Sequence, residues 1–177
     1  MANYDIEDIG IDHPSLLTAH LEASVVARCR ESGGTPWRLR NHCNQLPVAG
    51  SADRDVDLVW QAATEGKADQ VARTYQANRV TEDAAIGACA AAFAALAEGE
   101  ITEVTQHGTR VDYWVDQRRA VLEISGLRTG DRIALHQRQA EKQRQLLSSG
   151  LRRLGYPGYV FVVAFGCHEA VISYHSK

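Results

Sequence analysis

Two acidic residues stand where neighbouring strands are expected. Asp112 lies within the predicted strand 110–116 and Glu123 within the predicted strand 120–125, with a tight turn between them. If these strands are antiparallel neighbours, both carboxylates approach one point. Two such groups suit a hard divalent cation such as Mg²⁺ or Mn²⁺, which can activate water and stabilise phosphoryl transfer. We therefore predict metal-binding and catalytic roles for Asp112 and Glu123.

Glu123 is the more informative of the two acids. The other residues from 120 to 124 are apolar, and an unpaired charge in an apolar strand is costly. A metal ion would supply the missing partner. The alternative is that the two carboxylates lie in water at a sheet end, or pair with an arginine such as Arg110 or Arg128.

The two acids and their flanking residues resemble the active-site strands of a nuclease superfamily. The segments VDY at 111–113 and VLEIS at 121–125 are similar to those of the PD-(D/E)XK nucleases, and the resemblance covers residues 81–177. It implies a helix, a three-stranded meander, a helix and a further strand, with catalytic carboxylates on the second and third strands. Asp112 matches the first acid and Glu123 the second. The implied activity is metal-dependent cleavage of DNA or RNA.

The chain departs from that superfamily at the position of its lysine. The superfamily has a lysine two residues after the second acid, where this chain has Ser125. Serine has no positive charge, so it cannot replace that lysine in offsetting charge. A cation from another segment could do so, and the candidates are Arg128, Arg138 and Lys142. We assign the catalytic role to Lys142; without such a cation the active site would be degenerate.

Other side chains could complete the site. Glu82 or Glu103 could supply a third acid. Some branches of the superfamily place a glutamine on the helix after the third strand, and Gln139 and Gln143 stand on the matching helix here. A glutamine on an amphipathic helix also suits the boundary between core and solvent, so both interpretations of these two residues stay open.

The segment 128–153 is basic within a chain of net charge -3. It holds seven arginine and lysine residues against two acids. A one-sided basic stripe on a helix can follow a phosphate backbone. The alternative is the solvated outer face that any helix packed on a sheet needs. The residues predicted to bind nucleic acid are Arg128, Arg138, Lys142, Arg144 and Arg152.

The elements that must position these residues are read from periodicity and turn signals. The stretches expected to be strands are β-branched or aromatic and are bounded by turn residues. One of them, 159–165, is wholly apolar, which predicts a central strand covered on both faces. The predicted fold class is α/β, with a central mixed sheet and flanking helices. Its elements are a helix over 81–98, strands over 101–106, 110–116 and 120–125, a helix over 133–154, and strands over 159–165 and 170–175.

Residues 1–80 are expected to form an N-terminal helical lobe ahead of a nuclease-like core at residues 81–177, the two making one compact unit. Apolar residues recur at helical spacing over 13–32, and Gly33 and Gly34 would end that helix. The stretch 35–51 contains two prolines and is expected to be irregular. Further helices are expected over 53–64 and 68–76.

The composition narrows the classes of protein. The chain has 177 residues, 45% of them hydrophobic and 23% charged, which is typical of a single globular domain. No apolar run reaches the roughly 18 residues that span a bilayer, and the acidic start lacks a secretion signal. We therefore expect a cytoplasmic protein without a membrane partner. The four cysteines have no CxxC spacing, which argues against a zinc ribbon or a redox dithiol.

Two classes of function stay open on the sequence alone. The first is a nucleic-acid-binding or metal-dependent nuclease-like protein, active or with a degenerate site. The second is a non-catalytic adaptor or chaperone-like module, such as a subunit of a defence or conflict system, with a protein partner or as a homodimer. The second rests on Ser125 and on the modest acidity. Convergence of Asp112 and Glu123 in space would favour the first.

Overall fold

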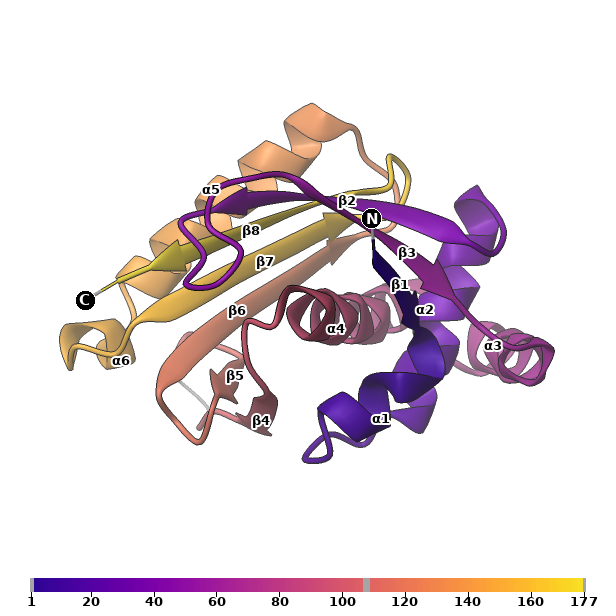
Figure 1. Cartoon of the computed structure of the whole chain (residues 1–177), viewed down its shortest axis with the longest axis horizontal. Coiled ribbons are helices and arrows are strands. Elements are labelled where there is room, and N and C mark those ends of the chain that lie inside the picture. The colour runs from indigo at the N-terminus through magenta and orange to yellow at the C-terminus, as the bar shows by residue number, and fades with distance from the viewer. Residues whose placement is uncertain (1, 107–108, 177) are drawn as a thin grey trace.

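The central feature of the molecule is one mixed sheet. A computed structural model describes residues 2–106 and 109–176, and its eight strands have the order β1-β3-β2-β8-β7-β6-β5-β4 (Figure 1). The predicted α/β class with a central mixed sheet is therefore confirmed. The strands are β1 (Ala2–Asp5), β2 (Trp37–Asn44), β3 (Arg54–Val59), β4 (Ile101–Val104), β5 (Tyr113–Val115), β6 (Ala120–Leu127), β7 (Gly158–Ala164) and β8 (Glu169–His175).

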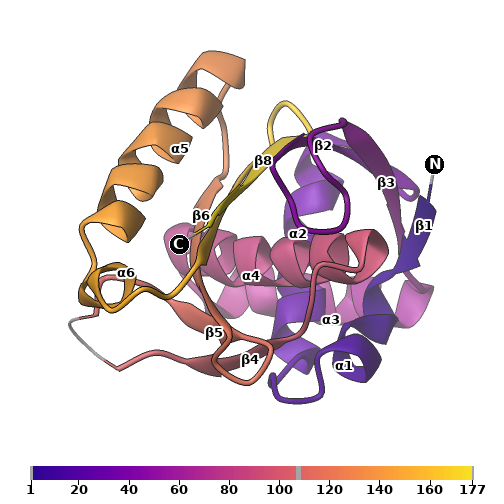
Figure 2. The ribbon, with the colours of Figure 1, turned by 60° about the vertical axis from the view of Figure 1, so that its left-hand side comes forward.

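Helices cover both faces of this sheet. Helix α5 lies on one face, and α4 lies on the other with α1, α2 and α3 around it (Figure 2). Each face has its own apolar cluster, one beneath α4 and one beneath α5. The helices are the 3-10 helix η1 (Ile6–Asp8), α1 (Ile9–Asp12), α2 (Ala19–Ser32), α3 (Ala62–Thr74), α4 (Ala77–Leu96), α5 (Arg132–Leu147) and α6 (Gly150–Arg153).

Small residues bring α4 close to its neighbours. A Cβ atom at Gly126 of β6 would lie 2.8 Å from the Thr81 carbonyl oxygen and 2.9 Å from the Ala85 Cβ atom. A Cβ atom at Gly87 would lie 2.6 Å from a methyl group of Val25 on α2. Helix α4 is thus packed closely between the sheet and α2. This close packing fixes one wall of the site described below.

The second half of the chain follows the predicted order of elements. Strand β7 is buried along its whole length and lies between β6, to which it is parallel, and β8, to which it is antiparallel. Strands β4, β5 and β6 form the antiparallel meander. One correction concerns the helix expected over 133–154, which is two helices. They are separated because the Ser149 side chain accepts a hydrogen bond from the Arg152 N–H and so caps α6.

The first half of the chain contains strands as well as helices, and here two predictions are wrong. The expected helix over 53–64 is strand β3, and the stretch expected to be irregular contains β2. These strands pair with register Arg38 opposite Asp57 and Arg40 opposite Asp55. The Arg38 guanidinium contacts the Asp57 carboxylate at 2.8 Å, and Arg40 contacts Asp55 at 3.4 Å. Cross-strand ion pairs of this kind stabilise a strand that carries alternate charges.

The sheet continues across the expected boundary between residues 80 and 81. That boundary falls inside α4, and strands β1, β2 and β3 extend the sheet beyond β8. The N-terminal segment is therefore an extension of the central sheet with its own helices α1 to α3. Among the residues described, no helix is both long enough and apolar enough to cross a membrane.

Candidate active site

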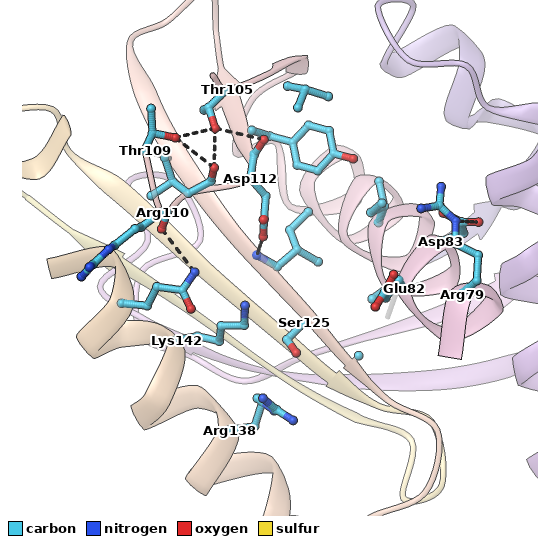
Figure 3. A pocket seen from close by; sticks show the side chains of 18 of the residues that line it. Arg79, Glu82, Asp83, Thr105, Thr109, Arg110, Asp112, Ser125, Arg138 and Lys142 are labelled. Carbon is cyan, nitrogen blue, oxygen red and sulfur yellow. Dashed lines mark hydrogen bonds and ion pairs between the residues drawn. The ribbon is translucent and has the colours of Figure 1, made fainter. Parts of the chain in front are cut away.

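A pocket of about 680 Å³ opens beside β6 at the point where β5 begins. Strand β5 pairs with β6 only over residues 120–122, so in the described structure no strand pairs with that edge of β6 farther along. Helix α4 forms one wall of the pocket and α5 the other (Figure 3). Because β5 is short, the edge of β6 beyond residue 122 faces a cavity between two helices.

Asp112 lies at this edge, one residue before β5. Its backbone N–H still donates to the Leu122 carbonyl oxygen at 3.0 Å. At the next N–H along this edge of β6, the partner is a side chain and not the backbone of a neighbouring strand. Asp112 Oδ2 accepts a hydrogen bond from the Ile124 N–H at 2.8 Å. This bond fixes the carboxylate at the edge of β6 and ends the β5–β6 ladder. Asp112 lines the pocket.

Glu123 is fully buried on β6. The Lys142 ammonium on α5 donates a hydrogen bond to Glu123 Oε1 over 2.5 Å. The second carboxylate oxygen, Oε2, is also buried and has no hydrogen-bond partner within the part of the chain that the structure describes. The carboxylate in this apolar strand is therefore paired through one oxygen, and its other oxygen is buried without a partner among the described residues.

The two carboxylates lie close enough to affect each other. Their strands run antiparallel with Tyr113 opposite Leu122, which brings Asp112 opposite Glu123 at the next position. Burial, and then the negative charge of Asp112, raise the pKa of Glu123 to about 7, although Lys142 acts in the opposite direction. Burial also raises the pKa of Asp112 above its ordinary value. Such perturbed groups in a pocket are typical of functional sites.

Of the five residues predicted to bind nucleic acid, Arg138 and Lys142 lie at the pocket, both on α5. The other three lie elsewhere. Arg128 pairs with Glu31 at 3.0 Å, and the exposed Arg144 contacts the Ala140 carbonyl oxygen of its own helix. Arg152 donates to the carbonyl oxygens of residues 156, 175 and 176, so it holds the C-terminal segment.

Of the remaining candidate residues, one lies at the pocket and the others lie elsewhere. Glu82 lines the pocket from α4, whereas Glu103 is on β4 and pairs with Arg118 at 2.6 Å. Gln139 contacts Ser173 on β8 at 3.2 Å, and Gln143 is not among the residues that line the pocket. The glutamine of α5 that lines the pocket is Gln145 instead.

Sequence reasoning assigned no ligand-binding role to Gln145 or to three charged residues of the pocket. The α5 residues that line it are 138, 142 and 145, and this spacing places them on one helix face. That signal is present in the sequence. The three charged residues are Arg110, from the loop before β5, and the ion pair between Arg79 and Asp83 on α4.

Asp112 and Glu123 fit a hard divalent cation. In the described structure no group of three or more His, Cys, Asp or Glu side chains is arranged to hold a metal. Mg²⁺, however, is commonly bound by one or two carboxylates and keeps several waters. Asp112 lines the pocket, whereas Glu123 is not among its lining residues and the unpartnered Oε2 of Glu123 is buried. The residues present therefore offer Mg²⁺ or Mn²⁺ one carboxylate at the pocket, that of Asp112, and a second, buried one at Glu123.

Comparison of the chain with family models, curated proteins and solved structures gives no match. Function must therefore be inferred from the pocket itself. Its carboxylates can bind a cation, Lys142 can offset negative charge, and the arginines at its walls can bind anions. A negatively charged substrate handled with the help of a metal ion is the chemistry that these groups have in common.

Proposed function

We propose that this protein hydrolyses phosphodiester bonds of DNA or RNA with the help of Mg²⁺ or Mn²⁺. The observation that carries the proposal is the contact between Lys142 and Glu123 beside Asp112. It places a lysine where the resemblance to the PD-(D/E)XK nucleases leads one to expect a cation, but from α5 rather than from position 125. The order of helix, three antiparallel strands, helix and parallel strand also agrees with that resemblance.

In this mechanism Asp112 and Glu123 would hold the cation. When bound, Mg²⁺ or Mn²⁺ would polarise the phosphate and lower the pKa of a bound water. Lys142 orients Glu123 through Oε1, and the buried Oε2, which has no hydrogen-bond partner among the described residues, would be the ligand atom. The lysine charge also offsets negative charge that develops on the phosphate. The water oxygen bonds to phosphorus as the water gives up a proton, one P–O ester bond breaks, and the leaving oxygen takes up a proton, so that one water is consumed.

Arg138 would bind the substrate backbone beside this centre. Its guanidinium is half-exposed and pairs with Glu141 on its own helix at 3.2 Å. Exposed pairs of this kind contribute little free energy, so a phosphate can replace Glu141.

All four cysteines are free, and free thiols are typical of a reducing compartment. We therefore propose that the activity is cytoplasmic.

Cleavage of labelled single- and double-stranded DNA and RNA, with Mg²⁺, Mn²⁺ or EDTA, tests the proposal. We expect cleavage that needs the metal. Asp112→Asn and Glu123→Gln should each reduce it at least about 100-fold, because each keeps the side-chain shape and removes the charge. Arg119→Ala, in the exposed turn between β5 and β6, is the matched control. Absence of cleavage on every substrate, or full cleavage by both variants, would refute the proposal.

A second candidate is a non-catalytic adaptor or chaperone-like module that binds a protein partner or forms a homodimer in a multiprotein system, such as a defence system. The burial of Glu123 outside the pocket lining favours it, because a buried acid paired with a lysine at 2.5 Å needs no metal at that oxygen. Sedimentation of the purified protein would detect a homodimer. Calorimetric titration with Mn²⁺ separates the two candidates, since the adaptor predicts no binding that depends on Glu123.

A further inference from the structure

We propose that Arg110 binds the phosphate next to the one at the carboxylates and so positions the substrate strand. This inference rests on the proposed function and names a residue that the sequence pattern does not assign to it. Arg110 lines the same pocket and stands two residues before Asp112. Its side chain is exposed at the mouth of the pocket, on the side of α5 (Figure 3).

The backbone at Arg110 is held in an unfavourable conformation. Its φ angle is +63°, in the left-handed region that residues with a Cβ atom seldom occupy. Hydrogen bonds fix the chain on both sides. The hydroxyls of Thr105 and Thr109 donate to the Val111 carbonyl oxygen, and Gln145 on α5 donates to the Arg110 carbonyl oxygen at 3.4 Å. Strain kept in place by surrounding bonds is common at ligand-binding positions.

The charge of Arg110 is available to a ligand. Of the other arginines at the pocket, Arg79 pairs with Asp83 at 3.0 Å and Arg138 pairs with Glu141 at 3.2 Å. The guanidinium of Arg110 has no acidic partner among the described residues. A guanidinium with free N–H groups matches the geometry of a phosphate and can bind two of its oxygens.

The position of Arg110 along α5 defines a path for the strand. Gln145, which contacts Arg110, lies one turn beyond Lys142, and Arg138 lies one turn before it. Figure 3 shows Arg110, Lys142 and Arg138 in succession on the α5 side of the pocket. From residue 138 to residue 145 the helix rises about 10 Å. A strand along this wall presents one phosphate to the carboxylates and its neighbours to the two arginines.

Binding of a short, fluorescein-labelled single-stranded DNA, measured by anisotropy in EDTA at several salt concentrations, tests this inference. We expect Arg110→Ala to weaken binding about tenfold and to reduce the slope of log affinity against log salt by about 0.7, the loss of one phosphate contact to a single strand. Arg110→Lys should recover part of both effects. Arg119→Ala is the control, since it removes the same charge from an exposed turn outside the pocket.

Cleavage kinetics separate this inference from the proposed function. We expect Arg110→Ala to raise KM about tenfold and to leave kcat within about twofold. If wild-type protein cleaves DNA and Arg110→Ala matches it in KM and in salt slope, Arg110 is not a phosphate contact and the proposed function stands. If Arg110→Ala weakens binding but Asp112→Asn cleaves like wild type, the proposed function fails and the phosphate contact stands. Absence of DNA binding by wild-type protein would overturn the inference.

Discussion

Two glutamates on strands of the same sheet face α5, and each is bound to a cation of that helix. Glu123 on β6 contacts Lys142, and Glu169 on β8 contacts Arg132 through two hydrogen bonds of 2.8 and 2.5 Å. Their pKa values nevertheless move in opposite directions. Burial raises the pKa of Glu123 to about 7, whereas the hydrogen bonds from Arg132 lower that of Glu169 to about 2.

The difference lies in the surroundings of each pair. Glu123 is fully buried, has Asp112 nearby and uses only one of its oxygens. Glu169 is partly exposed, and both of its oxygens contact the guanidinium of Arg132. A cation partner alone therefore does not distinguish a structural ion pair from a site able to do chemistry. Burial, a second acid and an unpartnered oxygen distinguish the two here.

The largest expected effect is on stability. Lys142→Met removes one partner of a buried pair and should lower the free energy of unfolding at pH 8 by about 3–5 kcal/mol. Arg132→Met breaks a pair whose arginine is exposed and should cost about 0–1 kcal/mol. Urea unfolding followed by circular dichroism measures both. Equal losses in the two variants would show that the pairs do not differ in the way proposed.

The next effect is on activity. Under the proposed function, Glu123→Gln should reduce metal-dependent cleavage about 100- to 1000-fold, because the metal loses a charged ligand. Glu169→Gln should leave the cleavage rate within about twofold, since Arg132 holds both carboxylate oxygens of Glu169. Initial rates at saturating Mn²⁺ give the ratio. Similar losses in both variants would mean that Glu123 acts only through the fold.

The third effect is opposite dependence of stability on pH. Glu123 has a folded-state pKa above its ordinary value of 4.5, so the stability that its proton provides is lost as pH rises from 4.5 through about 7. Glu123→Gln should therefore gain stability relative to wild type over that range. Glu169 has a lowered pKa, so its contribution is present above pH 4.5 and is lost as pH falls towards 2.

Urea unfolding without metal at several pH values measures this contrast. The deficit of Glu169→Gln relative to wild type should shrink as pH falls from 4.5 towards 2. Parallel pH profiles for wild type and Glu123→Gln between pH 4.5 and 7 would show that Glu123 has an ordinary pKa in the folded protein.

The smallest effect concerns His42, which lies between two carboxylates. Its Nδ1 is 3.0 Å from Asp53 and its Nε2 is 3.3 Å from Glu169. His42→Ala should cost about 0.5 kcal/mol, because Arg132 still holds Glu169. The pKa of Glu169, followed by NMR titration, should stay below 4.5. A rise to that value would mean that His42, and not Arg132, controls this carboxylate.

The second half of the fold was accessible from the sequence because its strands are β-branched or apolar and have turn residues at their ends. The contact between Glu123 and Lys142 agrees with the expectation that an acid in an apolar strand must find a partner, while the catalytic roles of Asp112, Glu123 and Lys142 stay predictions. What the sequence left open was whether a metal ion, an arginine or Lys142 would be the partner of Glu123. That choice depends on the rotation of α5 above the sheet, which follows from packing and not from local pattern.

The first half was harder for a physical reason. In β2 and β3 the outward positions carry arginine and aspartate, which form ion pairs only after the two strands meet. Neither segment looks like a strand without the other, and Asp53, Asp55 and Asp57 also suit the first turn of a helix. Arg110 was given no ligand-binding role for a similar reason. Its placement depends on a left-handed residue and on a hydrogen bond from α5, both of which are tertiary features.

The hydrogen bond between the Ile124 N–H and the Asp112 carboxylate has a genetic consequence. The bond needs an acceptor oxygen but no charge, so the amide oxygen of asparagine can replace it. An aspartate codon becomes an asparagine codon by one base change. A copy of this gene can thus encode a folded protein without the charge at residue 112 after a single mutation. Under the proposed function, one mutation can therefore remove the activity while the fold is kept.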